Sequence, residues 1–204
     1  MRLKVIGITG PSGAGKTTVL HVLEELGAAV IDCDALYHKL LREDAALLGR
    51  IRDRFGPAVF DTEGNLDRKA LGNVVFHDQE ALSELNALTH AAVLAALDKL
   101  LAQAEGSGRK AAAVDAIALI ESGAAEKCAV TVAVTAPAEA RVKRLMAREG
   151  VSEDYARARI AAQKPDRFYE ENCDFVVRNG GKPEECRARA LALFEKIIDP
   201  KENS

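Results

Sequence analysis

Short runs of β-branched and alanine residues alternate along the chain with longer stretches in which apolar residues recur every three or four positions. The first pattern is typical of buried strands, and the second is typical of helices with one apolar face. Their alternation predicts an α/β fold, in which a five-stranded parallel sheet is flanked by helices. The predicted strands are residues 3–8, 28–31, 111–114, 129–134 and 174–178.

The second and third predicted strands are separated by far more chain than one crossover helix needs. Spacings of three and four between apolar residues predict a helix of about 25 residues in this segment. The residues are Ala81, Leu82, Leu85, Leu88, Ala92, Val93, Ala96, Leu97 and Leu100. We therefore predict a helical insert at residues 34–105, on the carboxyl edge of the sheet where open α/β folds bind ligands.

A glycine-rich segment directly follows the first predicted strand and precedes a helical pattern. It reads Gly10-Pro11-Ser12-Gly13-Ala14-Gly15-Lys16-Thr17-Thr18 and matches G-x-x-x-x-G-K-[ST] at every fixed position. In such a loop, backbone N–H groups surround the β-phosphate, the lysine reaches the β and γ oxygens, and the next hydroxyl ligates Mg²⁺. The sequence thus predicts a P-loop nucleoside triphosphate hydrolase fold. The candidate nucleotide-binding residues are Gly13, Ala14, Gly15, Lys16, Thr17 and Thr18, with Thr17 as the metal ligand.

The P-loop alone does not separate kinases from GTPases, motors and ATPases. Asp32 and Asp34 favour a kinase, because they lie two residues apart at the end of the second predicted strand. If that strand continues, both carboxylates share one face, where one can accept a hydroxyl proton and the other can bind metal-bound water. Alternatively, Asp34 only caps a helix that begins near Ala35. Asp115 closes the third predicted strand, where an acid is either a site residue near Mg²⁺ or an ordinary solvated terminus.

Basic residues concentrate between residues 141 and 167. Arg141, Arg144 and Arg148 have spacings that place them on one face of a helix opened by Pro137. Phosphoryl transfer spreads negative charge over the γ-phosphate oxygens, and a mobile cationic lid neutralises that charge and excludes water. For a single arginine a solvated face is the alternative. For the cluster we predict a helical lid at residues 141–171.

Composition limits the partners and the location. The chain has 204 residues, 48% of them hydrophobic, and a formal charge of −3, which favours one domain and neither nucleic acid nor a membrane as partner. Its four cysteines lack the spacing of a zinc or redox site, and the apolar run at its start is too short for a signal sequence. We expect a cytoplasmic protein, a monomer or weak homo-oligomer, with frayed residues from Pro200 to Ser204.

Several separate stretches give the chain a resemblance to dephospho-coenzyme A kinases over nearly its whole length. Near the start they are Thr9 with the P-loop, and Asp32-Cys33-Asp34. In the insert they are Gly64-Asn65-Leu66-Asp67-Arg68-Lys69-Ala70-Leu71, Val75-Phe76 and Leu85-Asn86-Ala87-Leu88-Thr89-His90. Later they are Lys143-Arg144-Leu145-Met146-Ala147-Arg148, Arg159-Ile160-Ala161-Ala162-Gln163, and Asp174-Phe175-Val176-Val177 leading to Asn179.

The resemblance implies a kinase that uses ATP and Mg²⁺ to phosphorylate the ribose 3′-hydroxyl of dephospho-coenzyme A, the last step of coenzyme A biosynthesis. It implies that Asp34 is the general base and Asp32 supports it, while Lys16 and Arg144 act on the transferring phosphoryl group. Asn179, with its Gly180-Gly181 turn, is expected at the adenine end of ATP. The expected acceptor-binding residues are Thr9, Asp32, Asp34, Arg68, Asn86, His90 and Asp115. From the residues alone, His90 on a long helix is more often a core or surface histidine.

Two departures from the family pattern stand out. Ala91 follows His90 where the family usually has proline, so the long helix is expected to run on unbroken. The family's D-x-P-L-L-hydrophobic-E segment is Asp115-Ala116-Ile117-Ala118-Leu119-Ile120-Glu121 here, without the proline and one leucine. Because that loop is expected to touch the acceptor, the change bears on substrate fit.

The whole chain is predicted to be one P-loop kinase domain, with a core of residues 1–33, 106–140 and 172–204. Two alternatives stay open at this point: another small-molecule, nucleoside or nucleotide kinase, and a nucleotide-binding switch without an acceptor. The switch is disfavoured because the chain has no N-K-x-D guanine-reading motif. A catalytically dead relative is disfavoured because Lys16, Thr17, Asp32, Asp34 and Arg144 are all present.

Overall fold

The structure is a computed structural model that describes residues 2–198, so the end predicted to fray lies outside the described residues. The chain divides into two compact units. The first combines the residues up to 31 with those from 101 onward, and the second comprises residues 32–100. The second unit overlaps most of the predicted insert, whose role as a substrate domain stays a prediction.

The first unit is built on a parallel sheet whose strand order is β2-β3-β1-β4-β5. Its central strand β1 pairs in parallel with β3 and β4, and β4 pairs in parallel with β5. All five predicted strands are confirmed to within one residue at each end. They are β1 (Lys4–Thr9), β2 (Ala29–Asp32), β3 (Ala111–Asp115), β4 (Val130–Thr135) and β5 (Phe175–Arg178).

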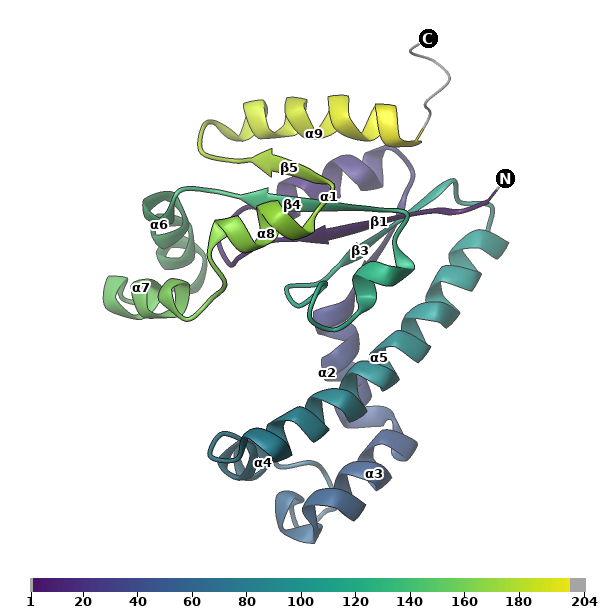
Figure 1. Ribbon diagram of the computed structural model, residues 1–204, viewed down its shortest axis with the longest axis vertical. Coiled ribbons are helices and arrows are strands. Elements are labelled where there is room, and N and C mark those ends of the chain that lie inside the picture. Colours follow the sequence, from purple (N-terminus) through teal and green to yellow (C-terminus); the bar gives the residue numbers. More distant parts are fainter. Residues whose placement is uncertain (1, 199–204) are drawn as a thin grey trace. The chain divides into compact units, whose positions relative to one another are not determined.

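One face of this sheet is covered by α1 (Lys16–Glu25) and α9 (Pro183–Ile198), as Figure 1 shows. Val19, Val22 and Leu23 of α1 and Phe194 of α9 are fully buried against strand residues such as Ile8. Burial of a large aliphatic or aromatic side chain contributes roughly 1.5–3 kcal/mol. This core therefore fixes the strand-to-helix turn from which the P-loop is made.

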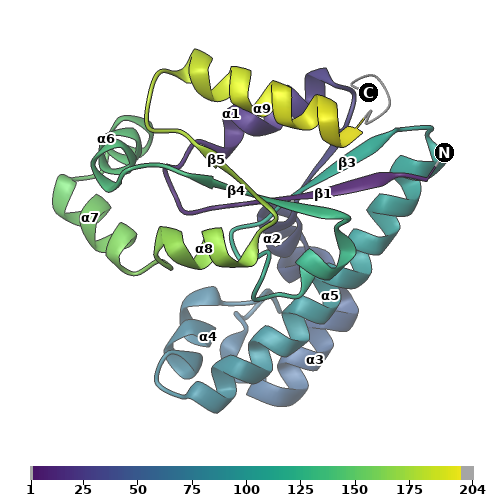
Figure 2. The ribbon, with the colours of Figure 1, turned by 45° about the horizontal axis from the view of Figure 1, so that its top comes forward.

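The connections from β3 to β4 and from β4 to β5 are also helical. After β3 comes a short 3-10 helix, η2 (Ala124–Lys127), and after β4 come α6 (Ala138–Glu149), α7 (Glu153–Ala161) and α8 (Asp166–Asn172). Figure 2 shows these last three as successive helices between β4 and β5. In the part of the predicted lid formed by α6 and α7, Val142, Leu145 and Ala156 make a small core of their own.

The regular elements of the second unit are helices, and an isolated antiparallel bridge joins Phe60 and Leu66. Its elements are α2 (Cys33–Glu43), α3 (Ala45–Phe55), the 3-10 helix η1 (Pro57–Val59), α4 (Arg68–Val75) and most of α5 (Gln79–Gly106). Leu47, Ile51, Val59 and Leu85 form its separate core with other apolar residues of the unit. The unit therefore has the independent apolar core that a distinct module needs.

Aspartates define where the helices of this unit begin. Asp32 caps α2 by accepting from Ala35 N at 2.8 Å, and Asp44 caps α3 by accepting from Leu47 N at 3.0 Å. Asp67 accepts from two backbone N–H groups at the start of α4. Each such cap contributes about 1 kcal/mol. Asp67 belongs to one of the family-like stretches, so part of that likeness reflects helix capping.

The helix α5 is 28 residues long and runs through Ala91 without interruption, as expected from the absence of a proline there. Length and composition alone make it apolar enough to cross a membrane, with a mean hydropathy of 1.3 over one window. Core helices of soluble proteins pass the same test. Leu85 and Ala92 of α5 are buried in the core of the second unit, and Ala104 packs with Leu3 and Ala112 in the first.

Candidate functional site: a phosphate pocket over the P-loop

The P-loop between β1 and α1 is shaped by glycines that no other residue could replace without strain. Gly10, Gly13 and Gly15 have φ of 138°, 77° and 97°, which side chains rarely adopt. A Cβ atom on Gly10 would lie 2.1 Å from the carbonyl oxygen of Val134, and one on Gly15 would lie 2.1 Å from Nδ2 of Asn179. The loop thus wraps closely against β4 and the residue after β5, as a backbone cradle for phosphate requires.

Lys16, Thr17 and Asp115, three of the predicted site residues, all line one pocket beside the P-loop. Lys16 begins α1; its Nζ lies 3.3 Å from the carbonyl oxygen of Gly10 and 3.9 Å from a carboxylate oxygen of Asp115. Thr17 is the second residue of α1 and is exposed. Asp115, the last residue of β3, is half-buried. The lysine and the acid therefore meet at the end of the central strands.

A small pocket of about 180 Å³ opens directly over this loop. Its cations are Lys16 from α1, Arg148 from α6 and Arg159 from α7, facing the acid Asp115. Three positive side chains converging on glycine-rich backbone are suited to a polyanion such as a triphosphate. The lining residues are Pro11, Ser12, Gly13, Gly15, Lys16, Thr17, Asp115, Ile117, Arg148 and Arg159.

Arg148 and Arg159 are held by the same carboxylate. Arg148 donates a hydrogen bond to one oxygen of Glu149, and Arg159 donates to the other at 2.6 Å. The hydrogen bond from Arg148, followed by the charge of Arg159, keeps the pKa of Glu149 below its usual value. A guanidinium has five N–H donors, so each arginine keeps donors for a phosphate while it binds Glu149.

Arg144, the arginine predicted to act from the lid, makes its contacts with the P-loop backbone. Its NH1 donates to the carbonyl oxygens of Gly13 and Ala14 at 3.2 Å, and its NH2 donates to that of Asn179 at 2.9 Å. Asn179 is buried and donates through Nδ2 to Ala14 O at 2.8 Å. Both residues therefore brace the cradle in this structure. The roles of Arg144 in catalysis and of Asn179 at the adenine end stay predictions.

The arginines expected on one helical face have different environments. Arg141 is only 4% exposed and donates to the carbonyl oxygen of Ser12 at 3.0 Å and to Gln163 at 2.9 Å. It belongs to the interior, whereas Arg148 is exposed. Sequence reasoning missed this buried network, because the P-loop motif and the stretch that ends at Gln163 do not show that Ser12, Arg141 and Gln163 meet.

The acids after β2 differ from the expected arrangement. The strand ends at Asp32 and α2 begins at Cys33, so the strand does not continue and the two carboxylates do not share a strand face. The cap of α2 is Asp32 and not Asp34. Asp34 lies in the first turn of α2 and is exposed. The alternative in which Asp34 only caps the helix is thereby removed.

The remaining candidates of the second unit lie on α4 and α5. Arg68 is the exposed first residue of α4, while Asn86 and His90 are one turn apart on α5, exposed and half-buried respectively. Burial raises the pKa of Tyr37, and the nearby charge of Arg68 opposes that rise. Tyr37 on α2 therefore lies near Arg68, one helical turn from Asp34, a neighbour that the sequence did not indicate.

Thr9 and the altered segment after β3 lie against each other. Thr9 is fully buried and its hydroxyl donates to the carbonyl oxygen of Ile117 at 3.1 Å. Leu119 is also fully buried, and Ala116 N donates to Ile8 O at 3.1 Å. The segment is thus anchored on β1 without the family's proline. Contact of Thr9 and Asp115 with an acceptor stays a prediction.

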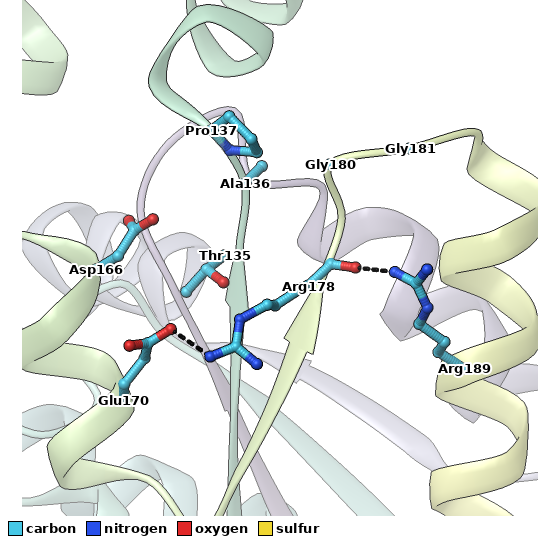
Figure 3. A pocket seen from close by; sticks show the side chains of 9 residues that line it. All are labelled: Thr135, Ala136, Pro137, Asp166, Glu170, Arg178, Gly180, Gly181 and Arg189. Carbon is cyan, nitrogen blue, oxygen red and sulfur yellow. Dashed lines mark hydrogen bonds and ion pairs between the residues drawn. The ribbon is translucent and has the colours of Figure 1, made fainter.

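A second pocket, of about 420 Å³, lies at the ends of β4 and β5 (Figure 3). Both of its arginines already have partners in the pocket: Arg178 donates to Glu170 at 2.9 Å, and Arg189 donates to the carbonyl oxygen of Arg178 at 2.8 Å. The smaller pocket over the P-loop is therefore the better match to a phosphate. The larger one is lined by Thr135, Ala136, Pro137, Asp166, Glu170, Arg178, Gly180, Gly181 and Arg189.

Comparison with known proteins decides the family. The family model described as dephospho-CoA kinase matches residues 4–185. The chain belongs to the dephospho-CoA kinase family. A dephospho-CoA kinase of Geobacter sulfurreducens is 36% identical over 95% of this chain and 98% of its own length. One of Dehalococcoides mccartyi is 37% identical over 97% of this chain and 99% of its own length.

Solved structures agree with this membership. TT1252 from Thermus thermophilus superposes with a TM-score of 0.78 at 35% identity, covering 96% of this chain and 98% of that one. Dephospho-CoA kinase from Campylobacter jejuni gives a TM-score of 0.69 at 27% identity, with the same coverage. The predicted family and the predicted P-loop kinase fold are both confirmed.

Proposed function

We propose that the protein is a dephospho-CoA kinase, which transfers the γ-phosphate of ATP to the ribose 3′-hydroxyl of dephospho-CoA and releases coenzyme A and ADP. The observation that carries the proposal is the cationic pocket over an intact P-loop in a chain of this family. A phosphate donor is held by backbone N–H groups and cations at a helix N-terminus, which is what this pocket presents.

The residues around the P-loop suit ATP with Mg²⁺. Gly13 and Gly15 let the backbone curve around the phosphates, and Lys16 lies at the start of α1, where its charge can reach the β and γ oxygens. The hydroxyl of the exposed Thr17 is an oxygen ligand of the kind that Mg²⁺ takes. Asp115 lines the same pocket, where its carboxylate can accept hydrogen bonds from water bound to the metal. When bound with ATP, Mg²⁺ supplies positive charge that offsets the charge developing on the phosphoryl oxygens.

On the acceptor side, Asp34 is the proposed general base. It accepts the proton of the ribose 3′-hydroxyl as that oxygen attacks phosphorus, and Asp32 supports it by fixing the start of α2. The other proposed acceptor-binding residues follow from the family resemblance. They are Thr9, Arg68, Asn86, His90 and Asp115.

Arg148 and Arg159 belong to the predicted lid at residues 141–171 and line the phosphate pocket. They reach the phosphate pocket from α6 and α7, and Glu149 holds both of them there. Their proposed role is to stabilise charge on the transferring phosphoryl group, while Arg144 braces the loop beneath it. Mobility of the lid, a cytoplasmic location and a monomeric or weakly associated state stay predictions.

The reaction should depend on the acceptor. Purified protein with Mg-ATP is expected to release ADP rapidly when dephospho-CoA is added and only slowly without it, because water is a poor substitute for a positioned hydroxyl. A coupled ADP assay measures both rates, and mass spectrometry identifies coenzyme A as product. Equal ADP release with and without dephospho-CoA contradicts the assignment, and a panel of nucleosides then tests the other kinases.

Substitution of a lid arginine should lower kcat strongly only where its side chain lines the phosphate pocket. Arg159→Ala is expected to lower kcat by about tenfold to a hundredfold, because it removes a donor aimed at developing charge. Arg157→Ala is the matched control: Arg157 lies on the same helix but pairs with Glu139 and Glu153 outside the pocket. Its kcat should stay within about twofold of the parent, as expected for a surface ion pair. Equal effects of the two substitutions on kcat contradict a phosphate role for Arg159.

A further inference from the structure

The side chain of Gln163 is bonded to the P-loop at two points. Its Oε1 accepts from the backbone N–H of Ser12 at 3.1 Å, and its Nε2 donates to the Ser12 hydroxyl at 2.9 Å. Ser12 is only 6% exposed and lines the phosphate pocket. One amide therefore satisfies a backbone donor and a side-chain acceptor in the middle of the loop.

Arg141 completes this contact from α6. Its NH2 donates to Oε1 of Gln163 at 2.9 Å, and its Nε donates to the carbonyl oxygen of Ser12 at 3.0 Å. The N–H, hydroxyl and carbonyl groups of Ser12 are thus all bonded to Gln163 or Arg141. Because Arg141 is buried, these hydrogen bonds are shielded from competing water, and the loss of a bond to such a charged group costs about 1.5–3 kcal/mol.

The place of Ser12 in the loop explains why it needs external support. It lies between Gly10 and Gly13, two residues at positive φ that offer little resistance to rotation in the backbone. Gln163 follows the end of α7, in the turn before α8, and so belongs to the predicted lid. The contact joins two parts of the first unit that are 151 residues apart in sequence.

We infer that Gln163 is a positioning residue for the phosphate cradle, which holds Ser12 so that the loop is already shaped before ATP binds. The inference rests on the ATP-binding part of the proposed function and not on the identity of the acceptor. Without Gln163, ATP must itself order the loop, and that cost lowers its affinity. Both ground state and transition state use the same cradle, so kcat should change little.

The test is direct binding of a non-hydrolysable ATP analogue with Mg²⁺, measured by calorimetry without any acceptor. Gln163→Leu removes both polar atoms at similar volume and should weaken binding about tenfold, the equivalent of 1.4 kcal/mol. Gln163→Glu keeps an acceptor for Ser12 N–H and for Arg141, and should restore affinity to within about threefold of the parent. Gln103→Leu is the control, because it makes the same chemical change at an exposed position on α5.

Steady-state kinetics add a second measurement on the same proteins. The KM for ATP should rise with the dissociation constant in Gln163→Leu, while kcat and the KM for the acceptor stay within about twofold. If Gln163→Leu does not fold, Ser12→Ala removes one of the bonds and should give a smaller loss, of about threefold. Unchanged analogue affinity in the folded variants overturns the inference, as does equal weakening by Gln163→Leu and Gln163→Glu. If the variants change analogue affinity as expected but dephospho-CoA does not stimulate turnover, the proposed function is rejected and the inference about Gln163 stands.

Discussion

Asp34→Asn should lower kcat by about three orders of magnitude and leave the affinity for ATP nearly unchanged. The substitution removes a proton acceptor at almost constant volume. Asp34 is exposed in the first turn of α2 and is not the cap of that helix, so the cap that Asp32 provides is retained. A group that acts mainly in the transition state affects kcat, whereas a structural role would weaken binding and turnover together.

Asp32→Asn is the matched control for this experiment. Asn caps a helix about as well as Asp, so the bond that Asp32 accepts from Ala35 N survives while the charge is lost. We expect its kcat to fall about tenfold or less, because it supports the base without receiving the proton. A larger loss in Asp32→Asn than in Asp34→Asn assigns the base to Asp32. Equal losses of ATP affinity and kcat in Asp34→Asn contradict the proposal. Single-turnover kinetics with saturating ATP separate these cases.

The sheet and the P-loop could be predicted from sequence because their signals are local. Each strand is a short apolar run, and the P-loop places its fixed residues within eight positions, so neither depends on knowing distant contacts. The long helix could be predicted for the same reason, because its apolar spacing extends through Ala91 without a proline.

What the sequence did not predict has a common physical cause. The alternation rule for Asp32 and Asp34 holds only while a strand continues, and the cap at Asp32 ends it. Arg141 and Arg148 lie on one side of α6, but they are seven residues, or nearly two full turns, apart along its axis. The burial of each side chain therefore depends on which residues pack against it at that point of the helix. Ser12 and Gln163 contact Arg141, and no local pattern shows that these residues meet. Long-range packing therefore decided which cations face the phosphate pocket.

Lys16→Ala should damage both ATP binding and turnover, with a loss in kcat/KM of at least about a thousandfold. Lys16 is half-buried at the start of α1, with its Nζ 3.3 Å from the carbonyl oxygen of Gly10 and 3.9 Å from Asp115. Its ammonium group lines the phosphate pocket, where its charge acts on bound phosphate before and during transfer. Loss of a group used in both states raises KM and lowers kcat together, in contrast to the pattern expected for Asp34→Asn.

Lys16→Arg sharpens the test because it keeps the charge and changes its shape. A planar guanidinium does not fit the position of a compact ammonium group, so we expect partial recovery of ATP affinity and little recovery of kcat. Analogue binding and steady-state kinetics on both variants give the two quantities, and thermal unfolding shows whether each protein is folded. If Lys16→Ala binds the ATP analogue as tightly as the parent, the pocket over the P-loop does not bind the phosphates. In that case the roles proposed for Arg148 and Arg159 fail as well, because they depend on the same pocket.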